Sequence, residues 1–289
     1  MQNEEDTMQK IGLLLDSTAI TRPDILTRPF VKIAPLGVTI DGIESKETEV
    51  SEAAMIEHLR TAKKMTTSQP APGDFLRVYE EFFAEGYTHV IVCTLSDKIS
   101  GTAQSAILAK GMLDVPLEID IHPTCVASFG VALGAMALIA DIEAGRSFAD
   151  VVAHARSVFA DARVLFTLSD LMNLFRSGRL NRVSALIGTV LRIKPVIEMI
   201  EGRLQLTRRE RTNSACFDYF LDNVRAYRNI HEHVAVDVIH LNRAEWAERL
   251  VEAIGREFPD VDVHLTNTLS PVFYIHLGDQ GFGIAMTGE

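Results

Sequence analysis

The sequence predicts an α/β protein of two domains, the first built on a parallel sheet and the second an α+β domain with a mixed, largely antiparallel sheet. From residue 10 to about residue 155, short apolar runs alternate with helical patterns, as in parallel βαβ units. After about residue 158, two strand-like runs meet across Glu201-Gly202, a hairpin signal that makes neighbouring strands antiparallel. With 289 residues and 47% hydrophobic content, the chain is long enough for two domains of ordinary size.

In the first half we expect strands over residues 11–15, 90–93 and 117–121. Residues 72–85 predict a helix, because five apolar side chains recur at helical spacing and Gly86 supplies a stop. These side chains are Phe75, Val78, Tyr79, Phe82 and Phe83. Two more helices are predicted to begin near Thr102 and near Phe129.

The second half contains six short segments with strand character and two with helical character. We expect strands over residues 194–200, 204–206, 234–240, 261–265, 273–276 and 283–286, and helices over residues 214–227 and 244–258. The resulting division is a disordered leader over residues 1–9, a first domain over 10–157 and a second over 158–289. Ligands favour the cleft between two such domains.

Composition excludes several classes of function. The net charge of −11 gives no general attraction to nucleic acid or to anionic lipid surfaces. The polar, acidic start MQNEEDTMQK is unlike a secretory signal, and the longest apolar stretch, 131–140, falls short of the ~20 residues of a membrane-spanning helix. Cys93, Cys125 and Cys216 lack the spacing of a zinc site. We therefore expect a cytoplasmic protein with reduced thiols, no metal and no transmembrane segment.

Three strands of the first half end in loops that carry hydroxyl groups. These loops contain Asp16-Ser17-Thr18, the segment 94–102, and Thr124 with Ser128. Carboxyl ends of parallel strands share one edge, so the loops should converge on one crevice. The middle loop, TLSDKISGT, also opens a helix whose free amides favour an anion. Ser100 or Thr102 could equally be the N-cap of that helix, whereas Ser96 lies nearer the strand end.

Two further segments have both a structural and a functional interpretation. Thr66 to Gln69 in TTSQPAP is typical of a turn and a helix start, yet it places three hydroxyl groups together. His276 ends an apolar run and enters the glycine-rich segment HLGDQGFG, which is a poor dinucleotide fingerprint because no helix clearly follows. A histidine near a strand end is more often structural than functional.

Basic residues gather in one part of this acidic chain. Arg192, Lys194, Arg203, Arg208, Arg209 and Arg211 form a run that usually indicates a solvated strand face. Arg179 differs, because the turn residue Gly178 beside it could direct the guanidinium group at a carboxylate or a phosphate.

Several motifs in order resemble those of the DegV family of bacterial fatty-acid-binding proteins, the acyl-carrier subunits of fatty acid kinase. The motifs are LLLDST at 13–18, APLGVTIDG at 34–42, TSQPAPGDF at 67–75, LSDKISGTAQSA at 95–106, SGRL at 177–180, RIKPVI at 192–197 and IHLGDQGFGI at 275–284. The resemblance covers residues 10 to 286, and the spaced pair TSQP and LSxxxSGT is its most specific part. It implies an α/β/α first domain, a second domain with a mixed sheet, and a fatty acid between them.

The resemblance also implies roles for individual residues. Thr67, Ser96 and His276 are expected to bind the fatty acid carboxylate, and Arg179 to lie at the mouth. Arg209 is a further candidate for contact with a partner. The supporting loops contribute Ser17, Ser68, Ser100, Gly101, Thr102 and Gly278. The implied protein is a non-catalytic lipid-binding subunit without a cofactor, which presents its fatty acid to an ATP-dependent kinase.

Two aspartates depart from the family pattern. Asp97 stands where the family often has a serine, and Asp279 where many relatives have proline. Because a carboxylate facing the bound one would repel it, we expect Asp97 to point to solvent or to a cation.

Two other classes of function remain as alternatives. An esterase-like hydrolase would use Ser96 or Ser100 as nucleophile, His276 as base and Asp16 as orienting group, but the G-x-S-x-G motif is missing. A nucleotide-binding regulatory module would need a Walker lysine loop or a Rossmann fingerprint, and the sequence contains neither.

Overall fold

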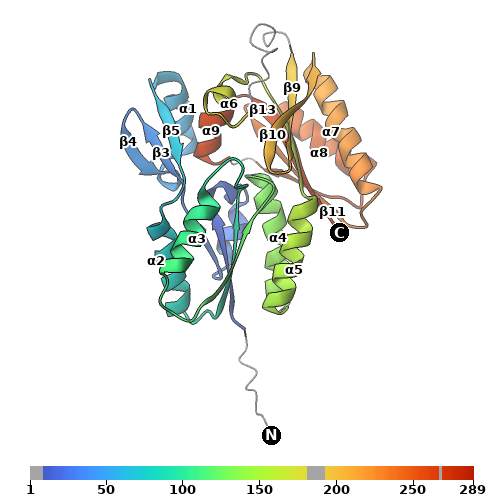
Figure 1. The fold of residues 1–289 in the computed structure, drawn as a ribbon. Helices are drawn as coiled ribbons and strands as arrows, with labels where there is room; N and C mark the ends of the chain where they lie inside the picture. Colours follow the sequence, from blue (N-terminus) through green and yellow to red (C-terminus); the bar gives the residue numbers. More distant parts are fainter. Residues whose placement is uncertain (1–8, 181–192, 267–268) are drawn as a thin grey trace.

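The computed structural model describes residues 9–180, 193–266 and 269–289, which form three β-sheets with helices around them (Figure 1). The first sheet has the order β2 (Val31–Ala34), β1 (Ile11–Asp16), β6 (His89–Thr94) and β7 (Glu118–Pro123). All of its neighbouring strands are parallel. The predicted parallel sheet of the first half is therefore confirmed.

Helices cover both faces of this sheet (Figure 1). Leu14, Val90 and Val92 pack toward α2 (Pro72–Ala84) and α3 (Thr102–Met112). The alternate residues of the same strands belong to a larger core that includes α4 (Phe129–Glu143) and α5 (Phe148–Asp161). Because successive strand residues point to opposite faces, these continuous apolar strands are buried on both sides.

A small antiparallel sheet lies beside the first one. Its order is β4 (Ile43–Lys46), β3 (Gly37–Ile40) and β5 (Met65–Ser68), and α1 (Glu52–Thr61) connects two of its strands. Two short 3₁₀ helices, η1 (Ser17–Ala19) and η2 (Pro23–Thr27), follow β1, and a third, η3 (Glu47–Glu49), precedes α1. The sequence did not predict this sheet, but it carries the TSQP segment.

The second half forms a six-stranded mixed sheet. Its order is β10 (Arg203–Glu210), β9 (Lys194–Ile200), β8 (Arg163–Leu168), β13 (Gly281–Gly288), β11 (Val234–Leu241) and β12 (Asp262–Thr266). Only the pair β11–β12 is parallel, so the predicted largely antiparallel sheet is confirmed. Helices α7 (Asn213–Arg228) and α8 (Ala244–Glu257) pack on one face, and α4 contacts β11 and β13.

One predicted strand is wrong. Residues 273–276 lie in helix α9 (Pro271–Leu277), which contacts the short helix α6 (Met172–Arg176) and strands β3 and β5 (Figure 1). The run of apolar residues was too short to separate strand from helix by periodicity. The overlooked signal was Pro271, which occupies the first helical turn.

The division into two domains stays a proposal. The expected boundary after residue 157 falls inside α5 (Phe148–Asp161), and the next strand, β8, already belongs to the six-stranded sheet. Helices α4 and α5 each contact strands of both large sheets. The expected leader, apart from Gln9, and Arg192 lie outside the described residues.

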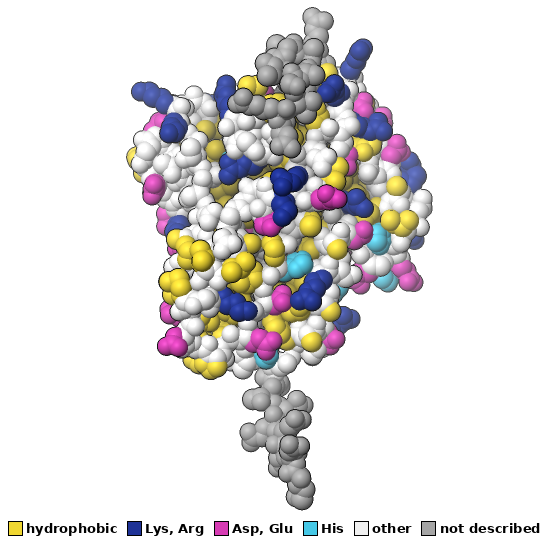
Figure 2. All heavy atoms as spheres, viewed as in Figure 1, with side chains coloured by type: hydrophobic (Ala, Val, Ile, Leu, Met, Phe, Trp, Pro, Cys, Tyr) yellow, Lys and Arg dark blue, Asp and Glu magenta, His cyan; other side chains and the backbone are white. Residues whose placement is uncertain are grey.

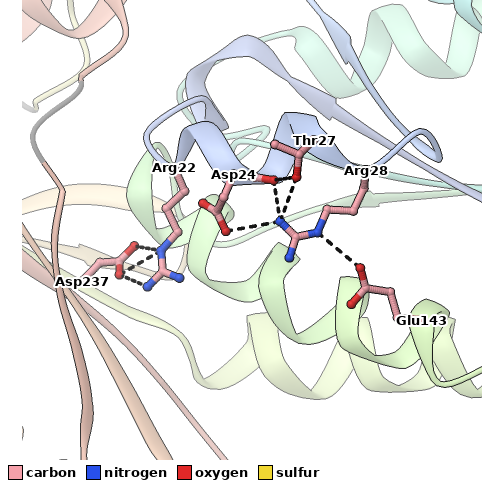
Figure 3. A network of polar contacts seen from close by, with 6 residues as sticks. All are labelled: Arg22, Asp24, Thr27, Arg28, Glu143 and Asp237. Carbon is pink, nitrogen blue, oxygen red and sulfur yellow. Dashed lines mark hydrogen bonds and ion pairs between the residues drawn. The ribbon is translucent and has the colours of Figure 1, made fainter.

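Ion pairs connect the segment around η2 to β11 and to the end of α4 (Figure 3). Arg22 Nε lies 3.1 and 3.0 Å from the two carboxylate oxygens of Asp237 on β11, and Arg22 Nη2 donates to the same carboxylate. Arg28 donates to Glu143 at the end of α4, 3.3 Å away. The first of these pairs links the two halves through a buried contact, because the Asp237 side chain is 0% exposed.

The visible surface mixes both signs of charge, and hydrophobic side chains gather on the lower left of the face in Figure 2, in the region of α2 and α3. Ile107, Leu108 and Met112 of α3 are exposed. No helix within the described part of the chain is long and apolar enough to cross a membrane. The three cysteines are free thiols, and Cys125 is the exposed one.

Candidate functional site

Two adjoining chambers lie where α9, α6 and the β9–β10 hairpin meet the loops of the first sheet. The polar chamber contains Thr67, Ser100, Arg179 and His276 among apolar residues such as Leu36, Leu95 and Val272. The apolar chamber is lined mostly by residues from β8, β11, β13, α9 and the start of α4. Both chambers share Ile99, Leu204, Phe273 and Leu277 in their walls. The two chambers are therefore direct neighbours, one almost wholly apolar and one with polar groups.

Thr67 and His276 meet in the polar chamber. Strand β5 alternates, so Met65 and Thr67 turn inward while their neighbours Thr66 and Ser68 are exposed. The Thr67 hydroxyl lies 2.9 Å from His276 Nε2, across 209 residues of sequence. The structure thus brings together two of the three residues expected at the carboxylate, and their role in binding stays a prediction.

His276 is a neutral imidazole at neutral pH. Burial, reinforced by the positive charge of Arg179, lowers its pKa from 6.5 to about 4. Its Nδ1 atom is buried and has no hydrogen-bond partner within the described residues. Thr67 is therefore the hydrogen-bond partner of the ring among the described residues.

Arg179 reaches the same chamber from the turn after α6. Gly178 has a φ of +74°, a left-handed conformation that favours glycine and directs the chain back toward the chamber. Arg179 Nη1 donates to the Ser177 carbonyl at 2.8 Å, and its Nε donates to the Ile99 carbonyl at 3.4 Å. These two bonds hold a half-buried positive charge beside Thr67 and His276.

The TSQP segment and the loop before α3 fit against one another. Gln69 Nε2 donates to Ser105 Oγ at 2.9 Å. A Cβ atom on Gly101 would lie 2.0 Å from Gln69 Oε1, so only glycine leaves room for this contact. Gly101 is also the N-cap of α3, and the hydroxyls of Ser100 and Thr102 bond to each other at 2.9 Å. Neither hydroxyl is the N-cap, which leaves Ser100 to line the polar chamber.

Ser96 has a different neighbour from the one expected. Its hydroxyl donates to the Gly202 carbonyl at 2.8 Å, and Ser96 is not among the residues that line either chamber. Gly202 lies in the turn of the β9–β10 hairpin with a φ of +77°, and a Cβ there would lie 2.4 Å from Ser96 Oγ. Ser96 thus joins the loop of the first sheet to the hairpin of the second half.

The three hydroxyl-bearing loops do converge at the carboxyl edge of the first sheet. The Asp16 carboxylate accepts from the Leu95 amide at 2.6 Å, and the Ser96 amide donates to the Val126 carbonyl at 2.9 Å. The Thr124 hydroxyl bonds within its own loop. These hydrogen bonds therefore hold the three loops together. Among the hydroxyl groups of these loops, that of Ser100 belongs to a residue that lines the polar chamber.

The other predicted site residues surround the chambers. Ser17 donates to Glu47 and accepts from the Leu36 amide at 2.8 Å, which positions a lining residue. Ser68 is exposed beside β3, and Gly278 ends α9 with a φ of +80°. Arg209 is exposed on β10 and does not line either chamber.

Neither of the two departing aspartates lines a chamber. Asp97 pairs with Lys98 Nζ at 3.1 Å, and its side chain is 47% exposed. The expectation that it faces solvent or a cation is confirmed. Asp279 contributes its backbone carbonyl to Asn242 Nδ2 at 3.0 Å and is half-buried.

Glu47 is a supporting residue that the sequence reasoning missed. Its carboxylate is buried in η3, where it accepts from Ser17, from Ser270 and from the Val272 amide at 3.1 Å. Burial raises its pKa above the usual range. Within ESKETEV it is one of several acidic residues, so only the fold reveals that it anchors the start of α9.

The described residues contain no cluster of three or more histidine, cysteine or acidic groups able to hold a metal ion. Fold and site together define an α/β protein with two large sheets and two adjoining chambers, one mostly apolar and one with polar groups. The chain belongs to the DegV family, because residues 10–289 match the family model described as "Uncharacterised protein, DegV family".

Individual relatives agree with this membership. A DegV domain-containing protein of Halalkalibacterium halodurans is 32% identical over 283 residues, which cover 96% of this chain and 98% of the relative. A fatty-acid-binding DegV family protein from Thermus thermophilus is 28% identical with a TM-score of 0.89, over 97% of this chain and 100% of that one. DegV from Bacillus subtilis, described as a fatty acid binding protein, is 26% identical with a TM-score of 0.85, over the same shares.

Proposed function

We propose that this protein binds one long-chain fatty acid, with the carboxylate in the polar chamber and the acyl tail in the apolar chamber. The observation that carries the proposal is the shared wall of Ile99, Leu204, Phe273 and Leu277, which places an apolar chamber directly against a chamber with polar groups. The fatty-acid-binding relatives from Thermus thermophilus and Bacillus subtilis support the same ligand class.

The tail and the head group of the fatty acid contribute differently to the binding free energy. A sixteen-carbon tail buries about fourteen methylenes at ~0.8 kcal/mol each, or roughly 11 kcal/mol before association costs. The polar chamber then has only to orient the head group. The Thr67–His276 pair can donate one proton to a carboxylate, either from the Thr67 hydroxyl when Nε2 carries the ring proton or from Nδ1 when Thr67 donates to Nε2. Arg179 supplies positive charge. A carboxylate is the common anionic group that these three side chains fit.

The first test is mass spectrometry of an organic extract from the purified protein. We expect a long-chain fatty acid in near-stoichiometric amount, because the gross burial energy favours retention. A protein that yields no fatty acid and also fails to bind added palmitate or oleate would exclude the proposal.

A matched pair of variants tests the head-group site. Thr67→Val keeps the shape of the side chain and removes its hydrogen bond, so we expect fatty acid affinity to fall roughly tenfold or more. Ser68→Ala alters the adjacent, outward residue of the same strand and should leave the affinity unchanged. Equal affinities for both variants in a calorimetric titration would show that the carboxylate lies elsewhere.

We further propose that the protein presents this carboxylate to a separate ATP-dependent kinase, which forms an acyl phosphate. The support is the resemblance of the spaced TSQP, LSxxxSGT and SGRL motifs to those of fatty acid kinase subunits, together with the half-exposed Arg179 at the polar end. Arg209, exposed on β10, is the second candidate for the kinase contact.

Phosphorylation with a partner kinase, ATP and magnesium tests this second step. Arg179→Ala is expected to reduce acyl phosphate formation more than fatty acid binding, and Arg209→Ala to reduce the former alone. Arg256→Ala, an exposed change on α8, serves as the control. Formation of acyl phosphate by the purified chain without a second protein would contradict the carrier role.

The hydrolase alternative has little support from the hydrogen bonds. His276 bonds to Thr67, Ser96 to Gly202, and Ser100 to Thr102. Asp16 accepts from Thr18 and from the Leu95 amide. A nucleophile needs a base within hydrogen-bond reach, and these serines are engaged with other groups.

A further inference from the structure

Gln69 of the TSQP segment bonds to helix α3, although it is not among the residues that line either chamber. Its Nε2 atom lies 2.9 Å from the Oγ atom of Ser105, a residue that is 0% exposed. Among the described residues, Gln69 is the hydrogen-bond partner of this buried hydroxyl. Because a buried hydroxyl without a partner is unfavourable, the bond favours one position of the Gln69 side chain.

The glycine at the start of α3 leaves space for this side chain. Gly101 has a φ of −85° and a ψ of 12°, a conformation that residues with side chains also adopt, so the backbone does not require glycine. A Cβ atom on Gly101 would lie 2.0 Å from Gln69 Oε1 and 2.7 Å from Gln69 Cδ. Gly101 therefore matters through the space that it leaves for the carboxamide group of Gln69.

The TSQP segment bonds to two different elements beside the polar chamber. Thr67 lies 2.9 Å from His276 on α9, whereas Gln69, two residues further on, bonds to Ser105 on α3. Pro70 is buried and restricts the residue before it to an extended backbone. The distance between the two contacts is therefore nearly fixed by the chain.

The loop beneath Gln69 carries the other polar groups of the chamber. Ser100, which lines the polar chamber, directly precedes Gly101. Arg179, which lines it as well, donates from Nε to the Ile99 carbonyl at 3.4 Å. The loop that Gln69 contacts therefore holds both a hydroxyl group and a guanidinium group of the polar chamber.

We propose that Gln69 is a positioning residue for the ligand carboxylate, because its bond to Ser105 fixes the distance between two groups of polar side chains. One group is Thr67 with His276, and the other is Ser100 with Arg179. The inference rests on the proposed function, in which the carboxylate of a fatty acid binds among these groups. Gln69 itself does not touch the ligand and acts through the residues on either side.

The test compares two ligands of equal tail length in the full-length, delipidated protein. Hexadecanoic acid and hexadecan-1-ol share the tail, but only the acid presents a carboxylate. In Gln69→Ala, we expect the affinity ratio of acid to alcohol to fall about three- to tenfold, while the affinity for the alcohol stays unchanged. A general loosening of the fold would lower both affinities and leave the ratio unchanged.

A double-mutant cycle tests the contact from its other side. Gly101→Ala places a Cβ atom against the Gln69 side chain, so it should lower the same ratio. Once Gln69→Ala has removed that side chain, Gly101→Ala should lower the ratio no further. Lys46→Met is the control, because it removes an ion pair with Asp74 that joins the same small sheet to α2, and it should keep the wild-type ratio.

The outcomes separate this inference from the proposed function. An unchanged ratio in Gln69→Ala, or additive effects of Gln69→Ala and Gly101→Ala, overturns the inference alone. An equal fall of the ratio in Lys46→Met also overturns it, since any loosening of the small sheet would then suffice. A wild-type protein that binds no hexadecanoic acid overturns the proposed function and this inference with it.

Discussion

A single histidine determines how the polar chamber responds to pH. His276 is held neutral by burial and by Arg179, and one of its ring nitrogens is bonded to Thr67. A fatty acid carboxylate bound nearby would favour the protonated ring and raise the pKa again. The histidine is therefore expected to take up a proton more readily with ligand than without it.

The first prediction concerns the stability of the ligand-free protein between pH 6.5 and 4. The folded state keeps His276 neutral down to about pH 4, whereas the unfolded chain binds the proton below about 6.5. The unfolded state thus binds more protons in this window, and stability falls as the pH decreases. His276→Gln should remove this part of the pH dependence of the free energy of unfolding, as measured by urea unfolding. Identical slopes for wild type and His276→Gln would contradict the lowered pKa.

At the scale of elements, α9 is positioned by one buried carboxylate. Glu47 of η3 accepts from Ser270 and from the Val272 amide, so it satisfies donors at the start of the helix that carries His276. A short helix of seven residues has little stability of its own. The geometry of the polar chamber therefore depends on a residue that does not line it.

The second prediction follows from this anchor. Glu47→Ala should destabilise the fold by about 2 kcal/mol or more, because three hydrogen bonds to a carboxylate are lost and the buried donors have no partner. Fatty acid affinity should also fall, since α9 holds His276. Glu44→Ala on the exposed strand β4 is the control for both unfolding and binding measurements. A normal affinity in Glu47→Ala would show that α9 keeps its place without the carboxylate.

Regular elements with strong local signals were predictable from the sequence, and elements defined by long-range contacts were not. The helix predicted over residues 72–85 agrees with α2. The predicted hairpin turn Glu201-Gly202 agrees with the positive φ of both residues between β9 and β10. The strand predicted over residues 273–276 was wrong, because a short apolar run fits a strand and a helix equally. The meeting of Thr67 and His276 came from family motifs, and the bond from Ser96 to Gly202 depends on how the two halves pack.

At the scale of the whole molecule, a buried ion pair joins the two halves. Arg22 binds Asp237 through two of its nitrogens, and their side chains are 11% and 0% exposed (Figure 3). Arg28, only six residues further on, pairs instead with Glu143, which is 50% exposed. The two arginines lie in one segment but differ in burial, so they form a natural comparison.

The third prediction uses that comparison. Arg22→Ala leaves a buried carboxylate without its partner and should destabilise the protein by about 3–5 kcal/mol. Arg28→Ala disrupts an exposed pair and should cost less than about 1 kcal/mol. Chemical unfolding of both variants measures the difference. Similar losses in the two variants would mean that the Arg22 pair contributes no more than a surface pair.

The shared wall of the chambers links ligand occupancy to the cooperativity of unfolding. Ile99 comes from the first half, whereas Leu204, Phe273 and Leu277 come from the second, so the proposed fatty acid would contact both. Such a ligand binds only when the two halves are folded and joined, and at a thousandfold excess over Kd it adds about 4 kcal/mol to that joined state. Any stepwise melting of the empty protein should therefore merge into one transition when the ligand is present. The acyl chain of the proposed ligand would then stabilise the joined state in the same way as a buried apolar side chain of the protein.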